Sequence, residues 1–298
     1  MKITLYYFIM YFYCIFVARK NNLAMANIQE TGNEGLTFED FKNENGITYW
    51  WASDMMKMLG YPNIKSFQKV LDRATKAFVS LGIPHYENII PEQRVLNDTL
   101  GQDFKLTRFA CYMSAMNADP KKQEVAIAQA YFAQQARKFE LHVAGHQDID
   151  RMLIREELVE GNKSLSSTAK RAGVSDFAKF ANAGYLGLYN MPSWKLEKRR
   201  YLKKGKLLDN MGRTELAANL FRVTQTEERI KSRGIRGQVA LEQTHTQVGK
   251  EVRAMVVDNT GMTPENLPQA KELPQVKKEL KKANREMKKE DKAKKKKK

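Results

Sequence analysis

Apolar side chains recur every three or four residues along most of this chain, the spacing that places them on one face of a helix. On this pattern, helices are predicted over residues 54–60, 64–82, 106–117, 120–143, 214–233 and 241–259, with two short helices around Gly173. Ser53, Asp119 and Thr214 stand where N-caps belong, because their side-chain oxygens can accept from the first free backbone N–H groups. The apolar spacing continues past Gly145 to Leu158, which predicts one long helix that connects two halves or pairs with a second copy.

A period of two, the mark of strands, is confined to the beginning of the chain. Residues 36–41 and 44–51 predict two short strands joined by a hairpin turn at Asn45-Gly46, whereas residues 83–105 predict a loop. The predicted fold class is therefore α+β and predominantly helical. The expected parts are a flexible segment 25–35, a small α+β N-terminal domain 36–142, a connecting helix 143–163, an all-α C-terminal domain 164–258, and a linker with a disordered lysine-rich tail 259–298.

The formal net charge of the 298 residues is +17, and two segments carry most of it. Residues 195–206 contain seven basic side chains and one acid, and residues 275–298 contain 13 basic side chains and four acids. Cations concentrated in this way predict a site for a polyanion, since a general surface charge would be spread along the chain. The tail is expected to add non-specific, salt-sensitive attraction to DNA.

Two aromatic residues, Trp194 and Tyr201, lie among the cations of the first segment. Cations neutralise phosphates and aromatic rings stack on unpaired bases, so the combination is typical of single-stranded nucleic-acid binding. The alternative is an exposed charged helix with Trp194 in the core. The nucleic-acid contacts predicted in this segment are Lys195, Lys198, Arg199, Arg200, Tyr201, Lys203, Lys204 and Lys206.

Two other segments have the helix, turn, helix layout of a DNA-binding motif. The residues predicted to face DNA are Lys65, Gln68, Lys69 and Arg73 in the first segment and Lys170 and Arg171 in the second, around Gly173. These side-chain types contact phosphates and base edges. Packed helices with solvated cations explain the same residues, so both interpretations stay open.

Enzyme signatures are missing from the sequence, which has no phosphate-binding loop, no GxGxxG, no HExxH and no CxxC pair. His142 and His146 have the spacing of two metal ligands on one helix face, but no third ligand is placed nearby. Cys111 lies in an apolar helix, which favours a buried structural thiol. A single cysteine in the body of the chain also fits a reducing compartment. We therefore expect no enzymatic activity, no metal and no cofactor.

Several long segments, from about Phe38 to about Leu280, resemble those of the DNA-damage-inducible protein D family of bacteria, in the same order. In the first half the resemblance rests on FEDFKNENGITYWWASDMMKMLGY and FACYMSAMNADPKKQEVAIAQAYFAQQARKFEL. In the second half it rests on AGVSDFAKFANAGYLGLY, KKGKLLDNMGRTELAANLFRVTQTEERI, THTQVGKEVR and GMTPENLP. The first half is also similar to the N-terminal domain shared by phage antirepressors and baculovirus repeated-ORF proteins, which implies contact with DNA.

The resemblance implies a cytoplasmic SOS-response protein without enzymatic activity, which modulates recombinational repair by acting on RecA filaments on single-stranded DNA. The polar positions best shared with the family have two alternative roles: they bind a partner, or they build the helical domain. They correspond to Lys203, Lys204, Arg213, Thr214, Glu215, Gln225, Glu227 and Glu228. The leading hypothesis is a repair modulator that binds DNA, with single strands preferred, or the RecA filament, or both. The alternative is a sequence-specific transcription regulator or phage-type antirepressor, which a palindromic DNA site and a homodimer through residues 121–158 would favour.

The resemblance leaves the apolar leader, residues 1–24, unmatched. Its apolar run, residues 3–18, is shorter than the roughly 20 residues that span a bilayer. Arg19 and Lys20 follow the run, where a signal peptide is normally uncharged. Phe, Tyr, Ile, Lys, Asn and Met, all written with A/T-rich codons, dominate this stretch, as in a translated upstream spacer. We expect that translation starts at Met25 and that the protein has no membrane partner.

Overall fold

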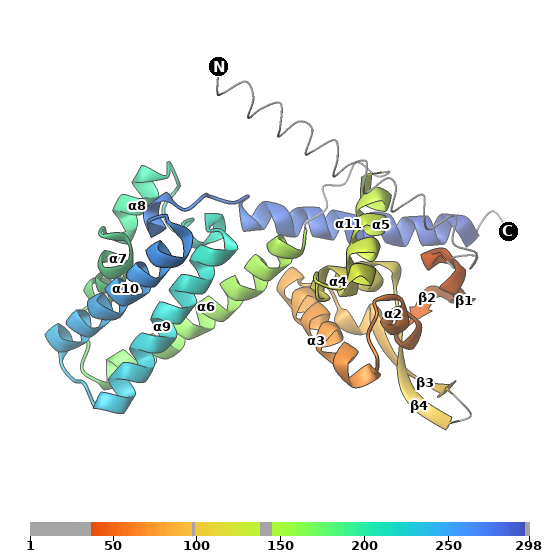
Figure 1. The fold of residues 1–298 in the computed structure, drawn as a ribbon, viewed down its shortest axis with the longest axis horizontal. Helices are drawn as coiled ribbons and strands as arrows, with labels where there is room; N and C mark the ends of the chain where they lie inside the picture. Colours follow the sequence, from red (N-terminus) through yellow and green to blue (C-terminus); the bar gives the residue numbers. More distant parts are fainter. Residues whose placement is uncertain (1–36, 97–98, 138–144, 296–298) are drawn as a thin grey trace, which may run out of the picture. The chain divides into compact units, whose positions relative to one another are not determined.

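A computed structural model of the protein describes residues 37–96, 99–137 and 145–295, and Figure 1 shows its helices and strands in chain order. The chain divides into a unit that ends at Tyr49 and a larger unit that begins at Trp50. The predicted leader, the flexible segment, His142 and residues 143–144 of the connecting helix lie outside the described residues. Gly145 is described, and it is the extended N-cap of a helix that begins at His146, so the prediction of one helix that continues past Gly145 is wrong.

The predicted hairpin turn is present in the first unit. Strand β1 (Asn43–Asn45) pairs antiparallel with strand β2 (Ile47–Trp51), in the register that sets Asn45 opposite Ile47. Gly46 between them has a positive φ of 70°, a backbone conformation that glycine adopts without a steric penalty. The Asn45-Gly46 signal therefore located the turn correctly.

The segment before the hairpin is not the strand that its apolar spacing predicts. Phe38–Phe41 forms a short 3-10 helix, η1. The hydroxyl and the backbone N–H of Thr37 both donate to the carboxylate of Asp40, and this bond lowers the pKa of Asp40. Such a capping interaction closes a turn and excludes an extended backbone, so the strand predicted at 36–41 is wrong.

A second hairpin lies where a loop was predicted over residues 83–105. Strands β3 (Ile89–Leu96) and β4 (Thr99–Leu106) pair antiparallel along their whole length, and the end of β2 pairs with β4. The strand order is β1-β2-β4-β3. Pro91 and Gly101 lie inside these strands and are residues that normally weaken a strand, which explains why the sequence favoured a loop.

The helices of this part follow the predicted apolar spacing. They are α2 (Ala52–Met58), α3 (Ile64–Leu81), α4 (Arg108–Asn117) and α5 (Gln123–Arg137), with the short η2 (His85–Glu87) before β3. The predicted face of α3 is buried from Phe67 to Phe78, and Cys111 is fully buried in α4, as predicted. However, α5 begins three residues after Pro120, where it was expected to begin.

Ser53, the predicted N-cap of α2, has a different role. Trp51 is the N-cap residue, whereas the Ser53 hydroxyl donates to the buried carboxylate of Asp103 in β4 at 2.6 Å. The backbone N–H of Ser53 donates to the other carboxylate oxygen at 3.1 Å. Ser53 thus bonds to Asp103, 50 residues away in the sequence, instead of capping its own helix, and this contact connects α2 to the sheet.

The second half of the chain is helical, as predicted, and the confirmed fold class is α+β with helices predominant. Its helices are α6 (His146–Arg171), α7 (Phe177–Tyr189), α8 (Ser193–Arg199), α9 (Arg213–Arg233), α10 (Gln238–Thr260) and α11 (Leu273–Lys295), with the 3-10 turns η3 (Leu208–Asn210) and η4 (Pro264–Asn266). α6 packs along α9, and α10 packs against α7 and α9. The N-cap of α9 is Gly212, so the predicted cap at Thr214 is wrong.

α7 and α10 approach each other closely at three glycines. A Cβ atom on Gly187 of α7 would lie 2.2 Å from the carbonyl oxygen of Thr246 and 2.9 Å from the Cα atom of Gly249, both in α10. A Cβ on Gly184, one turn earlier, would meet the side chains of Arg222 and His245. Glycine is therefore required at this crossing, because backbone atoms cannot move aside as a side chain can.

A chain of hydrogen bonds runs through the interior of these helices. The Tyr189 hydroxyl donates to Glu215, Asn219 donates to Tyr189, and Arg222 donates to Asn219. The network continues from Arg222 to His245, whose Nδ1 lies 2.9 Å from the carbonyl oxygen of Phe180. In order, the buried members are Glu215, Tyr189, Asn219, Arg222 and His245. Buried polar groups connected in this way specify one packing arrangement of the helices.

The buried imidazole of His245 predicts a loss of stability in mild acid. Burial, together with the positive charge of Arg222, holds the pKa of His245 well below its ordinary value. The histidine of the unfolded chain binds a proton at about pH 6.5, whereas that of the folded chain does not. The free energy of unfolding therefore has its full value above this pH and decreases as the pH falls below it. Urea unfolding should show a loss of about 1 kcal/mol between about pH 6.5 and 5.5. His245→Gln should abolish this slope, and an unchanged slope in the variant would contradict the assignment.

The lysine-rich segment is a helix as far as Lys295 rather than a disordered tail. α11 buries an apolar row that includes Val276, Leu280 and Met287, and it contacts α3, α4 and α6. Arg108 of α4 also forms an ion pair with Asp291 of α11 at 2.8 Å. The prediction of disorder is wrong here, because apolar residues three and four positions apart give the lysine-rich helix a face to bury.

Candidate nucleic-acid interface

The predicted basic segment begins in α8, a helix anchored at both of its ends. Leu196 is fully buried, and the Ser193 hydroxyl and backbone N–H both donate to Asn182 of α7, at 3.1 and 3.2 Å. Beyond the helix, Leu207 is buried in the same core. The segment between these anchors therefore presents its remaining side chains on a defined surface.

α8 ends in a Schellman motif, with Tyr201 in the left-handed conformation at a φ of 56°. The backbone N–H of Leu202 donates to the carbonyl of Glu197 at 2.9 Å, and that of Tyr201 donates to Lys198 at 3.1 Å. Glycine normally occupies this position, since a side chain strains the left-handed backbone. The carboxylate of Glu197 also accepts from the backbone of Gly205 at 2.7 Å, which closes the following turn.

The two aromatic side chains of the segment face solvent. Tyr201 is 97% exposed and Trp194 is 61% exposed, so the alternative that placed Trp194 in the core is wrong. A fully exposed aromatic ring on a strained backbone has no structural explanation within the fold. Because strain persists at functional sites, Tyr201 is a candidate contact residue.

Five of the predicted cations surround these rings on the outside of the protein. They are Lys195, Lys198, Arg199, Lys203 and Lys204, all exposed. Among the described residues, the structure records no ion pair for any of them, and Arg199 donates to the neutral side chain of Asn266 at 2.6 Å. Lys206 is half-buried near Asp209 and Glu272, at 3.7 and 3.4 Å. We define the α8 surface as Trp194, Tyr201 and the five exposed cations.

Arg200 does not belong to the α8 surface, contrary to the prediction. Its side chain is buried, and Nη1 donates to both carboxylate oxygens of Glu215, at 2.9 and 3.1 Å. A second donor of Arg200 bonds to the carbonyl of Pro264 at 3.2 Å. Burial raises the pKa of Glu215, although the charge of Arg200 opposes this effect. The pair ties the end of α8 to the beginning of α9 and so joins the α8 surface to the buried network.

The first helix-turn-helix candidate corresponds to α2 and α3. Lys65 and Lys69 of α3 are exposed, and the structure records no ion pair for either among the described residues. Gln68 is half-buried and bonds to Asp72 at 3.0 Å, and Arg73 is exposed but paired with Asp150 of α6. Two of the four predicted contacts are thus already engaged within the protein.

The second candidate, around Gly173, lies apart from the α8 surface. Lys170 and Arg171 are exposed in the last turn of α6, where cations favourably oppose the helix dipole. Arg155, also in α6, pairs with Asp209 next to the basic segment at 3.2 Å. Lys170 follows Arg155 by fifteen residues, a helical rise of about 22 Å, so it lies several turns away from the basic segment.

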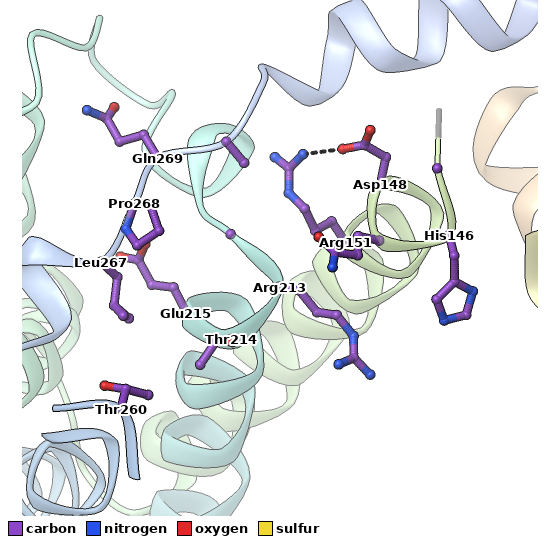
Figure 2. A pocket seen from close by; sticks show the side chains of 14 residues that line it. His146, Asp148, Arg151, Arg213, Thr214, Glu215, Thr260, Leu267, Pro268 and Gln269 are labelled. Carbon is purple, nitrogen blue, oxygen red and sulfur yellow. Dashed lines mark hydrogen bonds and ion pairs between the residues drawn. The ribbon is translucent and has the colours of Figure 1, made fainter. Parts of the chain in front are cut away.

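A cavity of about 670 Å³ lies between the beginnings of α6 and α9 (Figure 2). Arg151 lines it but is fully engaged as a crosslink. Its side chain donates to Asp148 at 2.7 Å and to the carbonyls of Met211 and Lys271 at 2.9 and 2.8 Å. Figure 2 shows the pair with Asp148 as a dashed line, while the side chains of Arg213 and His146 point away from this pair. Arg151 therefore holds the segments around the cavity together, whereas Arg213 and His146 point to a neighbouring space.

The comparison with known proteins agrees with the resemblance drawn from the sequence. Residues 145–279 match the family model of the DinD C-terminal domain. Over 248 residues, the chain is 41% identical to the DNA damage-inducible protein D of Escherichia coli (strain K12), covering 78% of this chain and 90% of that protein. The chain belongs to the DNA damage-inducible protein D family. Membership of the DNA damage-inducible protein D family supports a role in the DNA-damage response.

The polar positions that the sequence shares best with the family do not all belong to one site. Glu215 and Glu227 are buried, and Glu227 accepts from Ser164 and Thr168 of α6, so both build the helical core. Lys203 and Lys204 lie on the α8 surface. No helix in the described part of the chain is both long enough and apolar enough to cross a membrane.

Proposed function

We propose that this protein modulates recombinational repair by binding single-stranded DNA, either naked or within a RecA filament, through the α8 surface. Tyr201 carries this proposal, because it keeps an exposed aromatic ring at a backbone position that glycine would fill with less strain. The surrounding cations have no recorded acidic partners among the described residues, so phosphates can take that place. A ring that stacks on bases amid cations that bind phosphates is the usual arrangement in single-strand binding proteins.

The exposed face of α11 supports the same proposal. Lys278, Lys281, Lys282 and Arg285 are exposed and lie three or four residues apart, on the side opposite the buried row. A basic stripe on a helix adds salt-dependent attraction to a phosphate backbone without reading its sequence. In this proposal the protein is cytoplasmic, acts without catalysis, and draws its specificity from the strand form or from RecA.

The proposal predicts that Tyr201→Gly weakens binding to single-stranded DNA without harming the fold. Stacking contributes about 1–3 kcal/mol per base, so affinity for a single-stranded oligonucleotide should fall about tenfold. The free energy of unfolding should stay equal or rise by up to about 1 kcal/mol, because glycine relieves the left-handed strain. Fluorescence anisotropy over a salt series, with and without RecA, measures the affinity, and urea unfolding measures the stability.

Tyr86→Gly is the matched control, since Tyr86 is also well exposed but lies in η2, away from the basic segment. It should leave DNA affinity unchanged. Equal losses in both variants would contradict the role of the α8 surface. Tight binding of duplex at one sequence, with no effect of RecA, would favour the transcription regulator or antirepressor instead. Binding to neither strand form at low salt would refute the proposal.

A further inference from the structure

Three basic side chains converge on one buried carboxylate, away from the α8 surface. Asp150 of α6 has a side chain only 5% exposed, and Arg213 of α9 approaches it with Nε at 2.9 Å. Arg73 of α3 pairs with the same carboxylate, and His146 lies one turn before Asp150 with Nε2 at 3.3 Å from it. Figure 2 shows Arg213 and His146 extending to the same side of α9 and α6. One negative charge therefore faces two arginine cations, from α3 and α9, and one imidazole.

The two guanidinium groups keep most of their donors free. Arg73 reaches Asp150 with Nη2 and Arg213 reaches it with Nε, and the structure records no further partner for either side chain in the part of the chain it describes. Their side chains are 45% and 58% exposed. Each guanidinium has five N–H donors, so several donors point away from the carboxylate. Both groups can bind a second anion without releasing the first.

A concave space of about 340 Å³ lies beside these groups. Lys69, the exposed lysine one turn before Arg73, also lines it, together with the side chain of Ser66. Asp119 also lines the space, so Lys69, Arg73 and Arg213 against Asp119 and Asp150 give it a net charge of +1 without counting His146. Several long cations around a small cavity are suited to a compact anion with several oxygens, because the guanidinium fork matches phosphate geometry.

A purely structural ion pair in this protein has a different form. Arg253 of α10 places both amino groups on Glu265, at 2.6 and 2.9 Å, so one cation satisfies one carboxylate. Arg229 pairs with Glu251 in the same two-pronged way. At Asp150, by contrast, each arginine uses a single nitrogen, and the remaining donors line a cavity.

We propose that Lys69, Arg73 and Arg213 form a binding site for a phosphate group, and that Asp150 holds the two guanidinium groups in position. Both carboxylate oxygens of Asp150 already face a cation, since Oδ1 accepts from Arg73 and Oδ2 forms an ion pair with Arg213, which limits their repulsion of the ligand. The phosphate can come from the 5′ end of a nucleic-acid strand or from a free nucleotide. The site is separate from the α8 surface and does not depend on the function proposed for that surface.

Two measurements on the full chain test the site. In the first, fluorescence anisotropy compares single-stranded oligonucleotides of one sequence that carry either a 5′-phosphate or a 5′-hydroxyl. The phosphorylated strand should bind about tenfold more tightly, as expected for added charge-assisted hydrogen bonds. In the second, melting temperatures are compared in ATP, inorganic phosphate and chloride at equal ionic strength. A rise with ATP or phosphate but no preference for the 5′-phosphate would assign the site to a free phosphate compound.

Arg213→Gln and Lys69→Gln should both remove these effects. Lys69→Gln leaves the contacts of Asp150 intact, so it tests the site even where Arg213→Gln disturbs the packing. Arg233→Gln is the matched control, because Arg233 is exposed at the other end of α9 and should retain full phosphate binding. Loss of the α8 surface would weaken the binding of both oligonucleotides equally, whereas loss of this site would remove only the difference between their affinities. Equal behaviour of the three variants, or no response to any phosphate, would overturn the proposal.

Discussion

Glu215→Gln should lower the free energy of unfolding by about 3–5 kcal/mol, because it leaves the charge of Arg200 buried without a partner. The side chains of Arg200 and Glu215 are 3% and 1% exposed, so water cannot take the place of the lost carboxylate. Glutamine nearly preserves the shape of glutamate, which isolates the effect of charge from that of packing. Urea unfolding at neutral pH measures the loss.

The same substitution at Glu251 provides the control. Glu251 is also paired with an arginine of α9, at 2.6 Å, but its side chain is 45% exposed. Solvent screens such a pair, and Glu251→Gln should cost less than about 1 kcal/mol. The double variant Arg200→Met, Glu215→Met should recover part of the stability lost in Glu215→Gln, since no charge then remains buried. Equal losses at the two glutamates would contradict the buried-pair interpretation.

Gly187→Ala should destabilise the protein by about 3 kcal/mol or more, because the added methyl group overlaps the backbone of α10. The nearest atom, the carbonyl oxygen of Thr246, would lie 2.2 Å from the new Cβ, and it belongs to a helix that cannot shift locally. α7 and α10 would have to separate along their whole contact. Thermal and urea unfolding measure the effect, and loss of near-ultraviolet circular dichroism would report the loosened packing.

Gly161→Ala is the matched control in the middle of α6. There the new Cβ would lie 3.4 Å from the Cγ1 atom of Val223, a contact that small side-chain adjustments can accommodate. Alanine favours a helix over glycine by about 1 kcal/mol, so this variant should be neutral or slightly more stable. The same substitution should therefore act in opposite directions at the two glycines. A neutral Gly187→Ala would contradict the close approach of α7 and α10.

The helices could be predicted from sequence because their burial repeats every three or four residues. α3 shows this directly, since the apolar row read from the sequence is buried from Phe67 to Phe78, although Ile64 at its beginning is exposed. The β3-β4 hairpin was not predicted, because Pro91 and Gly101 interrupt its strand pattern. The strand pairing that stabilises it is visible only in three dimensions. Ser53 was misassigned for a similar reason, as its partner Asp103 is distant in the sequence.

The basic segment could be singled out from composition, but composition could not separate its buried cation from its exposed ones. Arg200 lies four residues after Leu196, on the side of α8 that faces the core, so helical spacing carried the missing signal. The same holds for α11, where Val276, Leu280 and Met287 keep their spacing beneath the lysines. In both segments the many charged residues obscure the helical spacing of the buried ones.

The cluster at Asp150 could not be predicted from one sequence. Arg73 and Arg213 are 77 and 63 residues away from it, and each is an ordinary surface cation when considered alone. Only folding brings α3, α6 and α9 together there. Sites built from distant residues of common types leave no local pattern, in contrast to the concentrated cations of the α8 surface.

The packing of α11 also has a consequence for the order in which the protein is made. Its ion pair between Arg108 and Asp291 joins residues 183 positions apart, and its buried face completes contacts with α3 and α4. The early helices therefore leave the ribosome with part of their final surface uncovered, and it stays uncovered until the last helix has been synthesised. Apolar surface exposed during that interval is a substrate for chaperones and a risk for aggregation. A stop codon shortly before α11 would accordingly yield an incompletely folded chain rather than a protein that merely lacks a basic tail.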